Sequence, residues 1–305
     1  MRIFSLVIIS LISFITTIAQ PLQVQSYTLS NINLPQDLNK QVCISGMKFY
    51  NGHLYFASER CTQVIVFDPV KATISRTIDI NVPQQFEMEG LTSYKDKLYA
   101  ISENVAAIYE INIQTGGIKL IETSTPLPPK SKVGDGMEGI AANEKNNKFY
   151  LLRERDDAMS HSQIYTFTVE PGKENSPIVL KNESMIELPL ENSQWRYSDI
   201  CVDMVNSRLL CLKSYSKGKL RQQFLESITI DATGKLLQET LKNIPVEKFT
   251  DASNVYKSQD YSMNLEGITI DNNGTIYIIS DNTSGKANCE LPAKEKTILL
   301  ELKKK

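Results

Sequence analysis

Carboxylate side chains recur at one position of a short repeated pattern, and their recurrence predicts a cation site. Each unit of the pattern begins with an acidic or hydroxyl residue, usually followed by glycine, at the head of a short apolar strand. The residues at this position are Ser45, Glu89, Glu138, Asp199 and Glu266. Four carboxylates brought to one place would repel one another and retain protons unless a cation lay among them.

A hard divalent ion is the occupant that we expect among these carboxylates, and calcium is the predicted cofactor. Calcium takes six to eight oxygen ligands, from carboxylates, carbonyls and water, at about 2.3–2.6 Å. We predict Glu89, Glu138, Asp199 and Glu266 as its ligands. The alternative is that these side chains cap turns or pair with lysine and arginine side chains.

A second set of charged residues ends the second strand of each unit and could take part in catalysis. The set and its basic neighbours are Glu59, Glu103, Glu154, Lys213, Asp281, Arg60, Arg153 and Arg155. Arginine can hold phosphate or carboxylate oxygens with two parallel hydrogen bonds. We predict that Glu103 or Glu154 acts as a base and that Arg153 and Arg155 stabilise developing negative charge. Surface ion pairing is the alternative.

The repeat itself predicts the fold that brings these residues together. It recurs at residues 44–60, 88–104, 137–155, 198–214 and 265–282 as two strands joined by a polar turn. A third strand follows each hairpin and a fourth follows most of them. Four antiparallel strands every 45 to 65 residues, roughly, are typical of a β-propeller blade. A β-sandwich is the alternative, but a motif at a fixed place in each unit argues against it.

We therefore predict an all-β propeller in which the first strand of each blade lines a central channel. The units give five blades, or six if residues 170–197 or 233–263 contain another. The N-terminal segment 22–29 has no partner in the first unit, so we expect it to complete the last blade and close the ring. The residues at the heads of the first strands would then converge on one axis.

The first residues predict export. Residues 1–19 contain one arginine, an apolar stretch and a small-residue exit, which is the pattern of a signal peptide. Residues 20–305 would then form a single propeller domain that is secreted or periplasmic and has no membrane contact after cleavage. A membrane anchor is the alternative, but no charged stop-transfer cluster follows. Sequons at Asn182, Asn273 and Asn282 predict a glycoprotein in a host that glycosylates.

Charge and cysteine content restrict the partners. The chain has 33 Lys+Arg and 35 Asp+Glu, a net charge of −2, which gives no basic excess for binding nucleic acid. The five cysteines are Cys43, Cys61, Cys201, Cys211 and Cys289. One or two disulfides fit an oxidising compartment, but the sequence leaves their pairing open. The absence of a CxxC motif and the presence of only two histidines argue against a Cys/His zinc site.

The repeat motifs resemble the secreted propellers of the family described as esterase-like activity of phytase, and the related SdiA-regulated propellers. The resemblance rests on "ISGM…LYFASER", "MEGLT…LYAISEN", "MEGIA…FYLLRER" and "LEGITID…IYIISDN", from about residue 40 to the end. It implies an exported propeller with calcium at the channel. The fourth unit departs from the pattern, with Ser-Asp-Ile in place of Glu-Gly-Ile, which weakens the prediction for Asp199.

The motifs are also distantly similar to regucalcin, gluconolactonase and paraoxonase propellers. That resemblance implies a central calcium that activates an ester or lactone, with asparagine among the ligands; Asn104 and Asn264 are the nearest candidates. Two functions remain open. One is a calcium-dependent hydrolase of a small anionic, ester or phosphoester substrate. The other is a non-catalytic exported binding propeller with a structural calcium and a protein or glycan ligand. Fold alone does not separate them, and we expect a monomer in either case.

Overall fold

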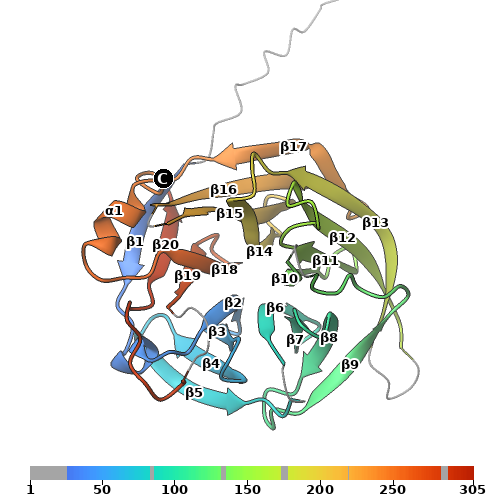
Figure 1. Ribbon diagram of the computed structural model, residues 1–305. Coiled ribbons are helices and arrows are strands. Elements are labelled where there is room, and N and C mark those ends of the chain that lie inside the picture. The colour runs from blue at the N-terminus through green and yellow to red at the C-terminus, as the bar shows by residue number, and fades with distance from the viewer. Residues whose placement is uncertain (1–25, 83–85, 132–134, 173–177, 219, 283–287) are drawn as a thin grey trace, which may run out of the picture.

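Antiparallel strands make up nearly all the regular structure of this chain. The computed structural model describes residues 26–305 except 83–85, 132–134, 173–177, 219 and 283–287. Figure 1 shows four-stranded units arranged side by side around a common centre, as the repeat predicted for a β-propeller. The predicted signal peptide, residues 1–19, lies outside the described residues. No helix in the described part of the chain is long and apolar enough to cross a membrane.

The strands follow the chain in groups of four, each running from the centre of the ring outward. The first group is β2 (Ile44–Tyr50), β3 (His53–Ser58), β4 (Gln63–Asp68) and β5 (Thr73–Asp79). The second is β6 (Met88–Tyr94), β7 (Lys97–Ser102), β8 (Ala107–Ile111) and β9 (Ile118–Thr123). The third is β10 (Met137–Asn143), β11 (Lys148–Arg153), β12 (His161–Glu170) and β13 (Val179–Pro189).

The remaining strands form two further groups. The fourth is β14 (Trp195–Asp203), β15 (Arg208–Lys217), β16 (Leu220–Ile230) and β17 (Leu236–Ile244). The last is β18 (Asn264–Ile270), β19 (Ile276–Asp281), β20 (Leu299–Lys304) and the N-terminal strand β1 (Tyr27–Ile32). A short helix, α1 (Ala252–Lys257), and a 3₁₀ turn, Gln36–Asn39, complete the regular structure.

The sheet topology follows these groups with one fusion. Three groups are separate four-stranded sheets, whereas the second and third share an eight-stranded sheet. The shared sheet is joined by a short parallel contact of β13 with β9, in which Val179 and Leu180 lie opposite Glu122 and Thr123. In the last sheet β1 pairs antiparallel with β20, from Tyr27 opposite Lys304 to Ile32 opposite Leu299. This strand begins later than the segment 22–29 expected from the sequence.

The innermost strands, β2, β6, β10, β14 and β18, lie side by side and form the centre of the ring. They approach one another so closely that a side chain is excluded at some positions. A Cβ atom at Gly90 would lie 2.7 Å from the backbone nitrogen of Ile140 on the next inner strand. The glycine after the carboxylate, expected to let the backbone approach the axis, therefore lets neighbouring inner strands approach each other.

Apolar clusters fill the space between successive four-stranded groups. Phe56 and Phe67 of the first group, for example, pack with Ile279 and Leu299 of the last. Such contacts arise because successive side chains of a strand point to opposite faces of its sheet. Every second side chain therefore lies on the face that a neighbouring group covers.

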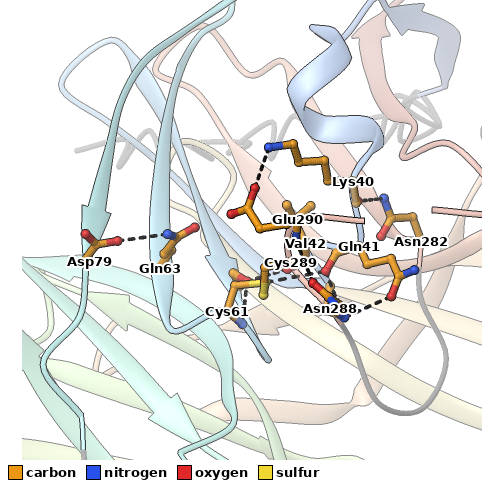
Figure 2. Close-up of a disulfide and its surroundings, with 12 residues drawn as sticks. Lys40, Gln41, Val42, Cys61, Gln63, Asp79, Asn282, Asn288, Cys289 and Glu290 are labelled. Carbon is orange, nitrogen blue, oxygen red and sulfur yellow. Dashed lines mark hydrogen bonds and ion pairs between the residues drawn. A yellow bond between two sulfur atoms is a disulfide. The ribbon is translucent and has the colours of Figure 1, made fainter. Parts of the chain in front are cut away.

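A disulfide joins the first and last groups (Figure 2). Cys61, in the turn after β3, bonds to Cys289, with a Cα–Cα distance of 5.9 Å across 228 residues of sequence. An ion pair of 3.1 Å between Lys40 and Glu290 supports the same junction. The sequence had left this pairing open.

Candidate metal centre at the mouth of the ring

A β-bulge at the head of each inner strand determines where the repeated acidic residue lies. The strand register shifts at Glu138, for example, between the pairs formed by Met137 and Gly139. Equivalent shifts occur at the same place in the four other inner strands. A bulge leaves the extra residue out of the ladder and re-aims its side chain. The residue at this position therefore recurs at the same place in the structure as well as in the sequence.

The predicted ligands Glu89 and Glu138 lie close to other carboxylates. Burial raises the pKa of Glu89 well above its usual value, and repulsion from Glu59 and Glu103 raises it further. The pKa of Glu138 is raised in the same way, first by burial and then by Glu89 and Glu154. In the described residues neither side chain has a basic partner at ion-pair distance. These two carboxylates therefore carry an unbalanced negative charge when ionised.

Glu59, Glu87 and Glu89 form a compact group that we call the acidic cluster. One carboxylate oxygen from each residue lies within 4.8 Å of the others. Arg60 bridges two members, at 2.7 Å from Glu59 and 2.6 Å from Glu87, and Lys130 lies 3.7 Å from Glu87. Sequence reasoning missed Glu87, although it stands two residues before Glu89, a spacing that puts both side chains on one face of an extended chain.

The spacing of the acidic cluster fits a calcium ion. Two oxygens that each lie about 2.4 Å from one ion can be at most about 4.8 Å apart. The observed separation meets this limit, and three carboxylates are hard oxygen donors of the type that calcium prefers. Backbone carbonyls and water would have to complete the six to eight ligands.

The predicted ligand Glu266 already has a cation of the protein as its partner. Arg196, on β14, lies 2.7 Å from Glu266 and 3.0 Å from Glu154, and it donates a hydrogen bond of 2.8 Å to the side-chain oxygen of Asn264. Burial raises the pKa of Glu266, and Arg196 opposes that rise. Sequence reasoning missed Arg196, which belongs to no repeated position.

Asp199 does not occupy the position of the repeated carboxylate. Ser198 is the bulged residue of β14, whereas Asp199 pairs in register with Leu212 and takes the position of glycine in the other four inner strands. Its two carboxylate oxygens accept hydrogen bonds from the backbone nitrogens of Ile200 (2.8 Å) and Ile268 (2.9 Å). Asp199 thus links β14 to β18 through backbone groups, which differs from the ligand role that the sequence predicted.

The two predicted bases have different surroundings. Glu103 pairs with Lys130 and accepts a 2.9 Å hydrogen bond from the backbone nitrogen of Gly136. Glu154 is buried, which raises its pKa to about 8 even though Arg196 opposes the rise. Near neutral pH Glu154 is therefore mostly protonated, and it can exchange a proton at the mouth of the ring.

The predicted arginines are held by other residues of the chain. Arg153 lies 2.6 Å from Asp157 and donates a 3.2 Å hydrogen bond to the backbone oxygen of Asp135. Arg155 pairs with the Asp135 side chain and donates a 2.8 Å hydrogen bond to the backbone oxygen of Ser193. These contacts orient both side chains but leave fewer of their donors for a substrate. Both arginines therefore fit the alternative interpretation of the sequence, in which these residues form ion pairs within the chain.

The ring of four-stranded groups, with acidic side chains gathered at one mouth, defines a β-propeller with a polar centre. The chain belongs to the Phytase-like family, described as esterase-like activity of phytase, whose model matches residues 45–283. This confirms the resemblance found in the sequence motifs. No curated protein sequence matches the chain.

One solved structure supports the fold. Glutaminyl cyclase from Myxococcus xanthus is similar with a TM-score of 0.51 and 12% identity, over 93% of this chain and 100% of that chain. A putative glucose dehydrogenase from Thermus thermophilus gives a TM-score of 0.48 and 9% identity, over 91% and 100%. At such low identity the first likeness shows the propeller fold alone, and the second carries no argument.

Proposed function

We propose that this chain is an exported five-bladed propeller. Each separate four-stranded sheet is counted as one blade, and the eight-stranded sheet as two, because in the described residues the only backbone pairing between its halves is the short contact of β13 with β9. The apolar cluster between those halves supports this count. The pairing of β1 with β20 closes the ring in this proposal. The leader-like residues 1–19 and the disulfide of Cys61 with Cys289 support export, because disulfides persist in oxidising compartments.

Calcium is the cofactor of this proposal, and Glu59, Glu87 and Glu89 would hold it. The observation that carries the proposal is the 4.8 Å grouping of their oxygens. Glu138 adds negative charge beside them. When bound, calcium supplies a Lewis acid that polarises an ester or phosphoryl oxygen and acidifies water. Of the ligands predicted from the sequence, Glu89 is a calcium ligand in this proposal. Glu266 instead pairs with Arg196, and Asp199 accepts hydrogen bonds from backbone nitrogens.

The proposed reaction is hydrolysis of a small ester or phosphoester, which is supported by the family description. Glu154, whose pKa is about 8, accepts a proton from water or returns one to the leaving group. Arg196 contacts Glu154 and therefore favours its ionised form. Arg153 and Arg155 position the surrounding loop through Asp135 and Asp157.

A pair of substitutions tests the proposal. The double variant Glu87→Gln/Glu89→Gln should lose both calcium-dependent thermal stabilisation and hydrolysis of p-nitrophenyl acetate and p-nitrophenyl phosphate. Glu122→Gln, at an exposed carboxylate of β9, is the matched control and should behave as the parent. Unchanged calcium response and turnover in the double variant would overturn the proposal.

A non-catalytic binding propeller with a structural calcium is the second candidate. It is favoured by ion pairs within the chain, which occupy all four predicted catalytic side chains: Glu103, Glu154, Arg153 and Arg155. Calcium-dependent stabilisation without turnover of either ester or of simple lactones would support this second function. The ligand would then be a protein or glycan that contacts the blade loops.

A further inference from the structure

A large polar cavity adjoins the mouth of the ring on the side of β14 and β18. Its volume is about 680 Å³, within the range of sites for small organic ligands. Arg196 lines this cavity and also contacts Glu154 and Glu266, so the cavity and the acidic mouth share a side chain. The described residues that line it are Gln41, Arg196, Ser216, Arg221, Ser262, Asn264, Asp281, Asn282, Lys294 and Glu295.

Arg221, on β16, is the unusual member of this lining. Its hydrogen bonds go to the backbone oxygens of Gly218 (3.0 Å) and Leu220 (3.3 Å), and within the described chain no carboxylate forms an ion pair with it. Its charged neighbours are Arg196, which repels it, and Glu266, which attracts it. Burial and Arg196 lower the pKa of Arg221. A partly buried arginine beside a second arginine is stabilised when an anion binds between or beside them.

The rest of the lining is polar and rich in hydrogen-bonding groups. Hydroxyl groups come from Ser216 and Ser262, and an amide comes from Asn264. Lys294 adds a positive charge at the exposed rim. Of the two carboxylates in the lining, Glu295 pairs with Lys257 and is therefore neutralised locally. Asp281 is the other, and it would disfavour an anion placed at its own end of the cavity.

A second cavity of about 440 Å³ meets the first at Arg221. The two share Arg221, Ser262, Asn264 and Glu295. Arg221 therefore stands where two polar hollows join, with room on either side for the body of a ligand that its guanidinium holds.

We propose that this pair of cavities binds a small hydroxylated organic anion, whose phosphate or carboxylate group pairs with Arg221 and whose hydroxyl groups contact the serine and asparagine side chains. Arg221 can form two parallel charged hydrogen bonds with such a group. This inference rests on the proposed function only in that the anion would belong to the substrate of the neighbouring metal centre. Binding itself needs no calcium and no turnover.

Isothermal titration in EDTA tests the site separately from the metal centre. The probes are glucose 6-phosphate, glucuronate, inorganic phosphate and neutral glucose, each titrated into the parent and into Arg221→Met. We expect the parent to bind at least one of the organic anions about tenfold or more tightly than glucose, and Arg221→Met to lose that preference. Preference for glucose 6-phosphate would identify a phosphate, and preference for glucuronate a carboxylate.

The matched control is Arg76→Met, which removes a partly exposed arginine from the outer strand β5, a residue that lines neither cavity. It should bind the anions as the parent does. Arg221→Lys should retain part of the affinity, because it keeps the charge without the two-pronged geometry. Equal binding by Arg221→Met and the parent, or no binding of either organic anion by the parent, would overturn the proposal. Both results are independent of whether calcium binds or an ester is hydrolysed.

Discussion

The two sides of the ring mouth differ in how many basic side chains pair with their clustered carboxylates. On the side of β2 and β6, three carboxylates of the acidic cluster share Arg60 and the more distant Lys130. On the side of β14 and β18, Arg196 contacts two carboxylates, one of which, Glu154, also has Arg155 at 3.9 Å. Nearby Arg221 forms no ion pair with a carboxylate in the described residues. The mouth of the ring thus has an acidic excess on one side, whereas arginines balance the carboxylates on the other. Small sequence changes between repeats can therefore specialise two halves of one ring.

Removal of Arg196 should have the largest effect, because it abolishes the contrast between the sides. Arg196→Met would leave Glu154 and Glu266 buried without their cation, and breaking a buried ion pair costs about 3 kcal/mol or more. Urea denaturation should report this loss in the free energy of unfolding. Arg76→Met should change it by less than about 0.5 kcal/mol. A similarly small change in Arg196→Met would mean that the two sides do not differ in this way.

Asp199→Gly gives the fourth repeat the residue found in the other four, and we expect an intermediate effect. The loss of two hydrogen bonds to backbone nitrogens should reduce the free energy of unfolding by about 2 kcal/mol. The calcium-induced shift in melting temperature should not change. Loss of that shift would restore Asp199 to the ligand role that the sequence predicted.

A single change in the acidic cluster tests the other side. Glu87→Gln should weaken calcium binding about tenfold, which removes about 1.4 kcal/mol of the stabilisation measured at saturating calcium. Thermal unfolding over a calcium titration measures this change, with Glu122→Gln as the control. If calcium stabilises Glu87→Gln and the parent equally, the metal does not bind at the acidic cluster.

The smallest expected effect is a pH dependence of the calcium-free protein. Burial raises the pKa of Glu154 to about 8, above its usual value of about 4.5. The folded state then binds more protons than the unfolded state between these pH values, so stability falls as pH rises through this window. From pH 7 to 8 we expect a loss of about 1 kcal/mol, which urea denaturation at each pH would measure. Glu154→Gln should make the profile less steep, although the raised pKa values of Glu89 and Glu138 keep a slope in the same direction. A parent whose stability rises with pH would contradict the assignment.

The sequence predicted the strands, the hairpins and the family, because apolar alternation and polar turns recur in each repeat. Repetition also located Glu89 and Glu138 correctly at the heads of inner strands. It could not locate Asp199, because the bulge decides which residue leaves the ladder and which takes the position of the glycine, and a bulge depends on pairing with the next strand. Arg196 and Arg221 belong to no repeated position. Their importance follows from contacts between blades that only the folded ring creates.

The pairing of β1 with β20 has a consequence for how the molecule forms. Thr28 is hydrogen-bonded to Lys303, 275 residues away in the sequence. The first strand to be synthesised, β1, therefore cannot pair until the last strand, β20, has been made. Contacts of such long range slow folding. Until then both strands present unpaired edges, which attract other chains. Aggregation is thus most strongly favoured before folding is complete, rather than in the folded state.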